Sequence, residues 1–247
     1  MNTFEFFKEK LDNEISHSVR AQLWFQEPSF EGDYLEFENF DVHCGISRAC
    51  IVSKDWNYVV KFTHTEDRRG DPCDRECTYY ENAVDSNIEM YFVEPKYIGT
   101  YTWRGNGYWA RRVFRDISYI DFSANSDEDI MEKIQEEDLD TIEPISIRLE
   151  LYEYPKVEEA KLGYYTPSKE LQNMVRKSGS NFAERNTNVA AYFVEKYGYE
   201  EFTRLADFLE WNEINDLHSG NIGYLGKRLV FIDYAGYYDP EGDYVTD

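Results

Sequence analysis

Hydrophobic positions near the start of the chain follow two different periods. Residues 3–16 have apolar side chains at helical spacing, which predicts an amphipathic helix: Phe4, Phe7, Leu11 and Ile15. From residue 34 onward the pattern is that of strands, at 34–40, 42–52 and 58–62, with residues 53–57 as a polar turn. A helix followed by an antiparallel meander is therefore predicted.

Later segments alternate between helix and strand signals. Residues 72–84 predict a helix with Pro72 in its first turn. Residues 96–103 and 108–114 predict a hairpin, with Arg104-Gly-Asn-Gly107 as its turn. Apolar residues also alternate from Ile145 to Leu151, which predicts an extended segment without an assigned partner.

The last third of the chain is predicted to be helical until it reaches a hairpin. Residues 168–177, 181–196 and 199–211 have helical patterns, separated by glycine-containing breaks. A short apolar strand, a glycine turn and a second strand at 229–232 follow. The order of the elements predicts an α+β protein, with a sheet before the helices.

Three oxygen-bearing side chains flank this last hairpin. Asp216 and Asn221 precede its first strand, and Asp233 follows its second. Magnesium prefers oxygen ligands and takes one or two carboxylates from a protein, with water and phosphate completing its shell. The pattern therefore predicts a magnesium-nucleotide site.

The two motifs that carry these residues also resemble a known family. Asp-Leu-His-Ser-Gly-Asn at 216–221 and Phe-Ile-Asp-Tyr-Ala-Gly at 231–236 are similar to the catalytic loop and metal-binding aspartate of the protein-kinase-like superfamily. The closest branch is the aminoglycoside phosphotransferases, because His218 matches their Asp-x-His-x-x-Asn form. The loop departs from the family pattern at Ile214, where a histidine is usual.

The resemblance implies a two-lobed protein-kinase-like fold. Its N-lobe would be an antiparallel sheet with one helix, and its C-lobe would be mostly helical. The implied boundaries are an N-terminal helical extension at 1–33, an N-lobe at 34–116 and a C-lobe at 117–247. The catalytic loop would be 214–221.

The resemblance also implies that the chain binds ATP and magnesium and transfers the γ-phosphoryl group to a small-molecule or protein hydroxyl. Asp216 would be catalytic, and Asn221 and Asp233 would hold the metal. Nucleotide-binding residues would be Lys61, its partner Glu76 or alternatively Glu81, and the turn residues Gly45 and Ser47. Folding would bring Lys61 together with Asp216, Asn221 and Asp233.

Charge narrows the range of partners. The chain has 26 basic and 49 acidic residues, a net charge of −23, which argues against a nucleic acid or an anionic membrane. It favours a cationic substrate or a basic partner, and residues 126–143 form a strongly acidic predicted helix. With neither a membrane span nor a signal-peptide pattern in the sequence, we expect a cytoplasmic protein.

Two alternatives to a phosphotransferase remain open at this point. One is a catalytically weak or inactive kinase-like protein that binds a nucleotide or a partner. The other is an acidic interaction or inhibitor protein on a kinase-like scaffold. Cys73 and Cys77 could in principle bind zinc with His43 or His64, but the spacing favours reduced structural thiols.

Overall fold

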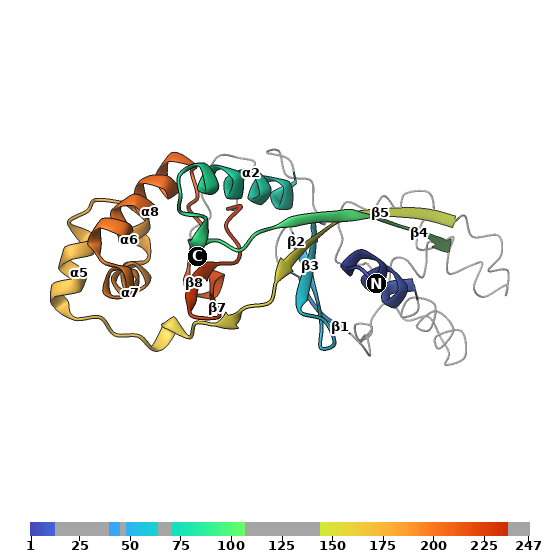
Figure 1. The fold of residues 1–247 in the computed structure, drawn as a ribbon, viewed down its shortest axis with the longest axis horizontal. Helices are drawn as coiled ribbons and strands as arrows, with labels where there is room; N and C mark the ends of the chain where they lie inside the picture. The colour runs from blue at the N-terminus through green and yellow to red at the C-terminus, as the bar shows by residue number, and fades with distance from the viewer. Residues whose placement is uncertain (13–39, 45–47, 64–70, 107–143, 237–247) are drawn as a thin grey trace, which may run out of the picture. The chain divides into compact units, whose positions relative to one another are not determined.

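The computed structural model describes residues 1–12, 40–44, 48–63, 71–106 and 144–236 (Figure 1). The chain forms two compact units, each assembled from two separate segments. Residues 1–66 and 96–153 form the first unit, and residues 67–95 and 154–247 form the second. The expected boundaries at 33/34 and 116/117 lie outside the described residues.

The first unit contains a five-stranded sheet in the order β1-β2-β3-β5-β4. Its strands are β1 (Phe40–Cys44), β2 (Arg48–Ser53), β3 (Tyr58–Thr63), β4 (Lys96–Asn106) and β5 (Pro144–Pro155). The pairs β1–β2, β2–β3 and β4–β5 are antiparallel. The α+β class with an antiparallel sheet is confirmed, and so is the polar turn after Ser53 between two paired strands. The predicted single strand at 42–52 is wrong, because its two ends pair with each other as β1 and β2. The predicted strand at 34–40 lies outside the described residues except for Phe40.

A helix at residues 3–12 packs in the first unit, as its periodicity predicts. Phe7 and Leu11 are buried, and the Phe6 ring stacks on Trp56 with 4.5 Å between centroids. Trp56 Nε1 also donates to Thr3 Oγ1 at 3.2 Å, and Tyr101 Oη donates to Asp12 at 2.9 Å. Aromatic stacking and two polar contacts thus hold this helix against the sheet and its turn.

The predicted hairpin turn at residues 104–107 is wrong over its described part. Strand β4 continues through Arg104, Gly105 and Asn106, which pair with β5 at Ser146, Ile145 and Pro144. Pairing with a strand that is distant in sequence therefore keeps these residues extended, although the two glycines favour a turn locally. The partner of β4 is the apolar alternation at 145–151, which had no place in the predicted sheet.

In its described residues, the second unit combines six helices or helical turns of the later segment with a helix and a helical turn of the earlier one. The earlier segment provides α2 (Pro72–Asp85) and the 3₁₀ turn η1 (Glu89–Tyr91). The later helical elements are η3 (Leu162–Tyr164), α5 (Lys169–Arg176), α6 (Asn181–Arg185), α7 (Thr187–Tyr197), α8 (Tyr199–Trp211) and η4 (Ser219–Asn221). Figure 1 shows α5 to α8 gathered on one side of the hairpin formed by β7 and β8.

Several helices begin at residues whose side chains are typical helix N-caps. Asp71 caps α2, with its side chain accepting from the Cys73 amide, and Pro72 follows in the first turn. Ser168 caps α5 and Ser180 caps α6 in the same way. The predicted single helix at 181–196 is instead two helices, because Asn186 has a non-helical backbone (φ −129°, ψ 48°) that ends α6 and begins α7.

A small sheet completes the second unit. It contains β6 (Glu158–Glu159), β7 (Ile222–Leu225) and β8 (Arg228–Phe231), in the order β6-β7-β8. The predicted apolar face of α8 is buried and consists of Phe202, Leu205, Phe208 and Leu209. None of the helices in the described ranges has the length and hydrophobicity of a membrane span.

Candidate functional site

The β7–β8 hairpin brings Asn221 next to the residue before Asp233. Ile222 pairs with Phe231, so the two strands are in register at the open end of the hairpin. One residue further out, the Ile232 amide donates to the Asn221 carbonyl at 2.9 Å. Two of the predicted metal ligands therefore leave the same end of one short hairpin, although 12 positions separate them in sequence (233 minus 221).

Asp216 is tied to Asn221 through its main chain. Asn221 Nδ2 donates to the Asp216 carbonyl at 2.7 Å, and the Asn221 amide donates to the His218 carbonyl at 3.0 Å. His218 Nδ1 accepts from the Gly220 amide at 3.0 Å, so the histidine caps η4. These bonds fix the loop in a single turn that leads into β7.

The side chains of this loop alternate between core and solvent. Ile214 and Leu217 are buried, whereas Asp216 and His218 are exposed. The Ile214 amide also donates to the Leu209 carbonyl at 2.8 Å, which joins the loop to the end of α8. Ile214 thus stabilises the loop by apolar packing at the position where the resembled family has a histidine.

The segment after Asp233 is bound by a buried carboxylate. Glu76 on α2 is fully buried, and its Oε1 accepts from the amides of Tyr234 at 2.8 Å and Ala235 at 3.2 Å. Its Oε2 accepts from Tyr154 Oη at 2.6 Å. A buried carboxylate requires such donors, and here it receives them from the chain directly after the predicted metal ligand.

Two further contacts hold the same segment. Tyr234 is fully buried, and its hydroxyl donates to the Val93 carbonyl at 2.8 Å. Arg75 donates to the Gly236 carbonyl at 3.5 Å, and Gly236 has φ +73°, a left-handed conformation that glycine adopts without strain. The backbone that carries Asp233 is therefore held on both sides, by β8 before it and by α2 after it.

Glu76 and Glu81, the two candidate partners of Lys61, differ sharply in environment. Glu76 is buried and Glu81 is exposed on the same helix. Of the two glutamates, Glu76 is therefore the one packed in the protein interior. Its pairing with Lys61 stays a prediction, because Lys61 belongs to the first unit and Glu76 to the second.

Lys61 is a buried basic residue in the sheet of the first unit. It lies on β3 opposite Cys50 of β2. Burial raises the pKa of the Cys50 thiol, and the charges of Lys61 and Arg48 partly oppose that rise. Lys61 is thus not an ordinary solvated strand residue, whereas Gly45 and Ser47 lie outside the described residues.

The cysteines do not form a zinc site in the described part of the chain. No group of three or more histidine, cysteine, aspartate or glutamate side chains that could hold a metal occurs there. Burial, together with the carboxylate of Asp74 and other nearby acidic groups, raises the pKa of the Cys77 thiol to about 12. Zinc needs the thiolate, so this environment disfavours it, while His64 lies outside the described residues.

The donor set at the hairpin fits magnesium better. Asn221 uses its side-chain nitrogen in the bond to Asp216, so Oδ1 is the amide atom that a cation could bind. Asp233 is half-buried and adds one carboxylate. One carboxylate and one amide oxygen make a typical protein contribution to a magnesium-phosphate complex.

Tyr154 is a site residue that the sequence does not reveal. Its hydroxyl bonds Glu76 across 78 positions of sequence, and it lies at the end of β5, where it is buried. Its position in the sequence carries no motif, because only the folded chain brings it to Glu76. Sequence signals predicted the ligands of the candidate site, while the contacts that hold the backbone beside them became visible in the structure.

A comparison of the chain with protein-family models finds no match, and a comparison with curated proteins finds no significant one.

Proposed function

We propose that this protein is a kinase-like phosphotransferase that uses magnesium and ATP and transfers the γ-phosphoryl group to a hydroxyl of a small molecule or a protein. The observation that carries the proposal is the arrangement around the β7–β8 hairpin. Asn221 and the residue before Asp233 are hydrogen-bonded at its open end, and Asn221 also bonds the main chain of Asp216. This is the order and spacing of functional groups that the kinase-like motif requires.

Each residue has a distinct part in this proposal. The Asn221 amide oxygen and the Asp233 carboxylate would hold magnesium. When bound, magnesium neutralises phosphate charge and polarises the transferred group. Lys61, in the first unit, is proposed to bind the nucleotide phosphates. Glu76 holds the backbone that carries Asp233, through the amides of Tyr234 and Ala235.

Asp216 would orient the acceptor. Its carboxylate is exposed and accepts no hydrogen bond from the described residues, so it is open to a substrate hydroxyl. The hydroxyl oxygen bonds to the γ-phosphorus while the bond from that phosphorus to the β–γ bridging oxygen breaks. The hydroxyl proton passes to Asp216, and ADP leaves with the bonding electrons.

Isothermal titration with ATP, with and without magnesium, tests this function first. We expect magnesium-dependent binding of ATP by the full-length chain, followed by slow ADP release when hydroxyl acceptors are supplied. Binding without turnover would favour the inactive kinase-like alternative. An absence of nucleotide binding with and without magnesium would contradict the proposal and favour the acidic interaction protein.

A further inference from the structure

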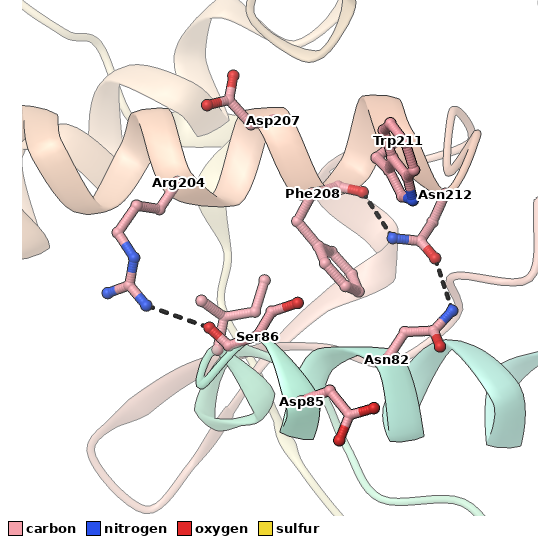
Figure 2. A pocket seen from close by; sticks show the side chains of 9 residues that line it. Asn82, Asp85, Ser86, Arg204, Asp207, Phe208, Trp211 and Asn212 are labelled. Carbon is pink, nitrogen blue, oxygen red and sulfur yellow. Dashed lines mark hydrogen bonds between the residues drawn. The ribbon is translucent and has the colours of Figure 1, made fainter.

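Helices α2 and α8 of the second unit border a groove that none of the predicted site residues lines. Its volume is about 560 Å³, and it is lined from α2 and its end by Asn82, Asp85, Ser86 and Ile88. From α8 and its end it is lined by Arg204, Asp207, Phe208, Trp211 and Asn212. Figure 2 shows the Phe208 ring pointing from α8 toward α2.

Polar bonds between the two helices cross this groove at two places. Asn82 Nδ2 donates to Asn212 Oδ1 at 2.8 Å, and Asn212 Nδ2 donates to the Phe208 carbonyl at 2.9 Å. Arg204 donates to the carbonyls of Ser86 at 3.2 Å and Asn87 at 3.4 Å (Figure 2). The helices are therefore antiparallel, and the groove is a formed feature with an apolar floor of Phe208 and Ile88.

The charge of the groove is negative. Its lining contains two carboxylates, Asp85 and Asp207, and one guanidinium, Arg204. Arg204 is the basic residue in the lining, and its guanidinium already has partners, because it also forms an ion pair with Glu201 at 2.7 Å. Asp85 and Asp207 are exposed and have no ion pair with a described residue.

Trp211 gives the groove an aromatic surface. Its side chain is 89% exposed, at the last residue of α8. Tryptophan is enriched at interfaces, where its ring is a frequent anchor. Helix α8 has no basic residue in its last turn, so its negative end also favours an external cation.

We propose that this groove is a docking site for an arginine- or lysine-containing segment of a protein partner. A guanidinium or ammonium group stacks on the Trp211 indole as a cation–π contact, and the carboxylates of Asp207 and Asp85 pair with neighbouring basic side chains. The net charge of −23 steers such a segment toward the protein. This inference is independent of the phosphotransferase proposal.

The test uses full-length protein and a fluorescein-labelled seven-residue peptide of alternating glycine and arginine. Anisotropy is measured at 0.15 M salt, with a glutamate-for-arginine peptide as the charge-reversed control. The double variant Trp211→Ala/Asp207→Asn should weaken binding about tenfold, from one cation–π contact and one ion pair. Trp211 and Asp207 are both exposed, so their replacement should leave the fold intact.

A matched variant separates the groove from general charge. Tyr164→Ala/Glu158→Gln removes another exposed aromatic ring and another exposed carboxylate of the same unit, and should change the affinity less than about twofold. Equal losses in both double variants would overturn the proposal in favour of diffuse attraction. No measurable binding to wild-type protein would also overturn it.

A second copy of the chain is the other possible occupant of the groove, and sedimentation velocity distinguishes it from a basic partner segment. We expect the same sedimentation coefficient for wild-type protein and Trp211→Ala at micromolar concentration. A wild-type dimer that dissociates in Trp211→Ala would overturn the proposal, because the groove would then be a self-association surface.

Discussion

Three carboxylates of the second unit lie in three different environments, and the environment indicates what each can do. Asp216 is exposed, Asp233 is half-buried at the end of a strand, and Glu76 is fully buried with three hydrogen-bond donors. An exposed carboxylate suits an acceptor that arrives from solvent. A buried carboxylate that accepts hydrogen bonds from three donors serves to hold the chain segments that carry those donors.

The first prediction separates the roles of Asp233 and Asp216. Asp233→Asn should raise the Kd for magnesium-ATP at least about tenfold, because the amide keeps the shape but loses the charge that attracts the cation. Asp216→Asn should bind magnesium-ATP as wild type does and should lower kcat by about a hundredfold or more. Titration calorimetry and ADP release measure the two effects.

Equal affinity of wild-type protein and Asp233→Asn for magnesium-ATP would count against the metal role. A parallel titration with ATP in EDTA is the control, since the variant and the wild type should then be alike.

The second prediction concerns Glu76. Glu76→Ala leaves the buried amides of Tyr234 and Ala235 and the Tyr154 hydroxyl without their acceptor, so it should lower the free energy of unfolding by about 3 kcal/mol or more. Tyr154→Phe removes one of these donors and should cost about 1–2 kcal/mol. Urea denaturation measures both changes.

Glu81→Ala is the matched control for Glu76→Ala. Glu81 is on the same helix but exposed, so its loss should change the free energy of unfolding by less than about 0.5 kcal/mol. Equal effects of the two substitutions would show that the bonds to Glu76 do not stabilise the segment after Asp233.

At the scale of elements, local signals predicted most of the helices and the hairpin that carries the site. Helix α8 and its apolar face, the proline at the start of α2 and the β7–β8 turn at Gly226 all appear where periodicity and capping placed them. These features depend on residues within a few positions of one another, which a single sequence contains.

Pairing over long distances could not be predicted in the same way. The register of β4 with β5 joins Lys96 to Glu153 and Asn106 to Pro144, and no spacing along the chain encodes that match. The same reason hides the bond of Tyr154 to Glu76, although Glu76 itself was a candidate. For the candidate site, sequence spacing predicted the ligands, whereas the contacts that support their backbone required the fold.

The third prediction concerns the strand that carries the site. Gly223 of β7 is closely approached by β6 and the residue before it, because a Cβ there would lie 2.6 Å from Val157 Cγ2 and 2.9 Å from the Glu158 carbonyl oxygen. Gly223→Ala should therefore push β6 away from β7 and cost about 1–3 kcal/mol of stability in urea denaturation.

A double-mutant cycle checks the cause of that loss. Val157→Ala in the Gly223→Ala background removes the closest contact but not the carbonyl, so it should restore part of the stability. A purely additive double variant would show that crowding between Val157 and Gly223 is not the source of the loss.

At the scale of the whole molecule, neither compact unit is a continuous stretch of sequence. The chain passes from the first unit to the second after residue 66, returns after 95 and leaves again after 153. The second unit needs both of its segments, since the Val93 amide donates to the Phe231 carbonyl at 3.0 Å and the Phe92 ring packs on Phe208, Phe231 and Tyr234. A fragment cut at residue 154 lacks these partners and Glu76.

The last prediction uses the point where the chain leaves and re-enters the second unit. Lys96 and Glu153 are directly opposite in the β4–β5 ladder, and their side chains form an ion pair at 2.9 Å. Because the strands are antiparallel, the next residues, Pro95 and Tyr154, are close enough to be joined by a short loop. A chain of residues 67–95 joined to 154–247 by a short glycine-serine linker should fold, with a cooperative urea transition followed by far-ultraviolet circular dichroism. Residues 154–247 alone should show no such transition, because they would expose the apolar surface that α2 and η1 cover in the intact unit. Cooperative unfolding of the shorter fragment would contradict this account, since it would mean that the hairpin carrying Asn221 and Asp233 forms without the helix that binds the segment after it.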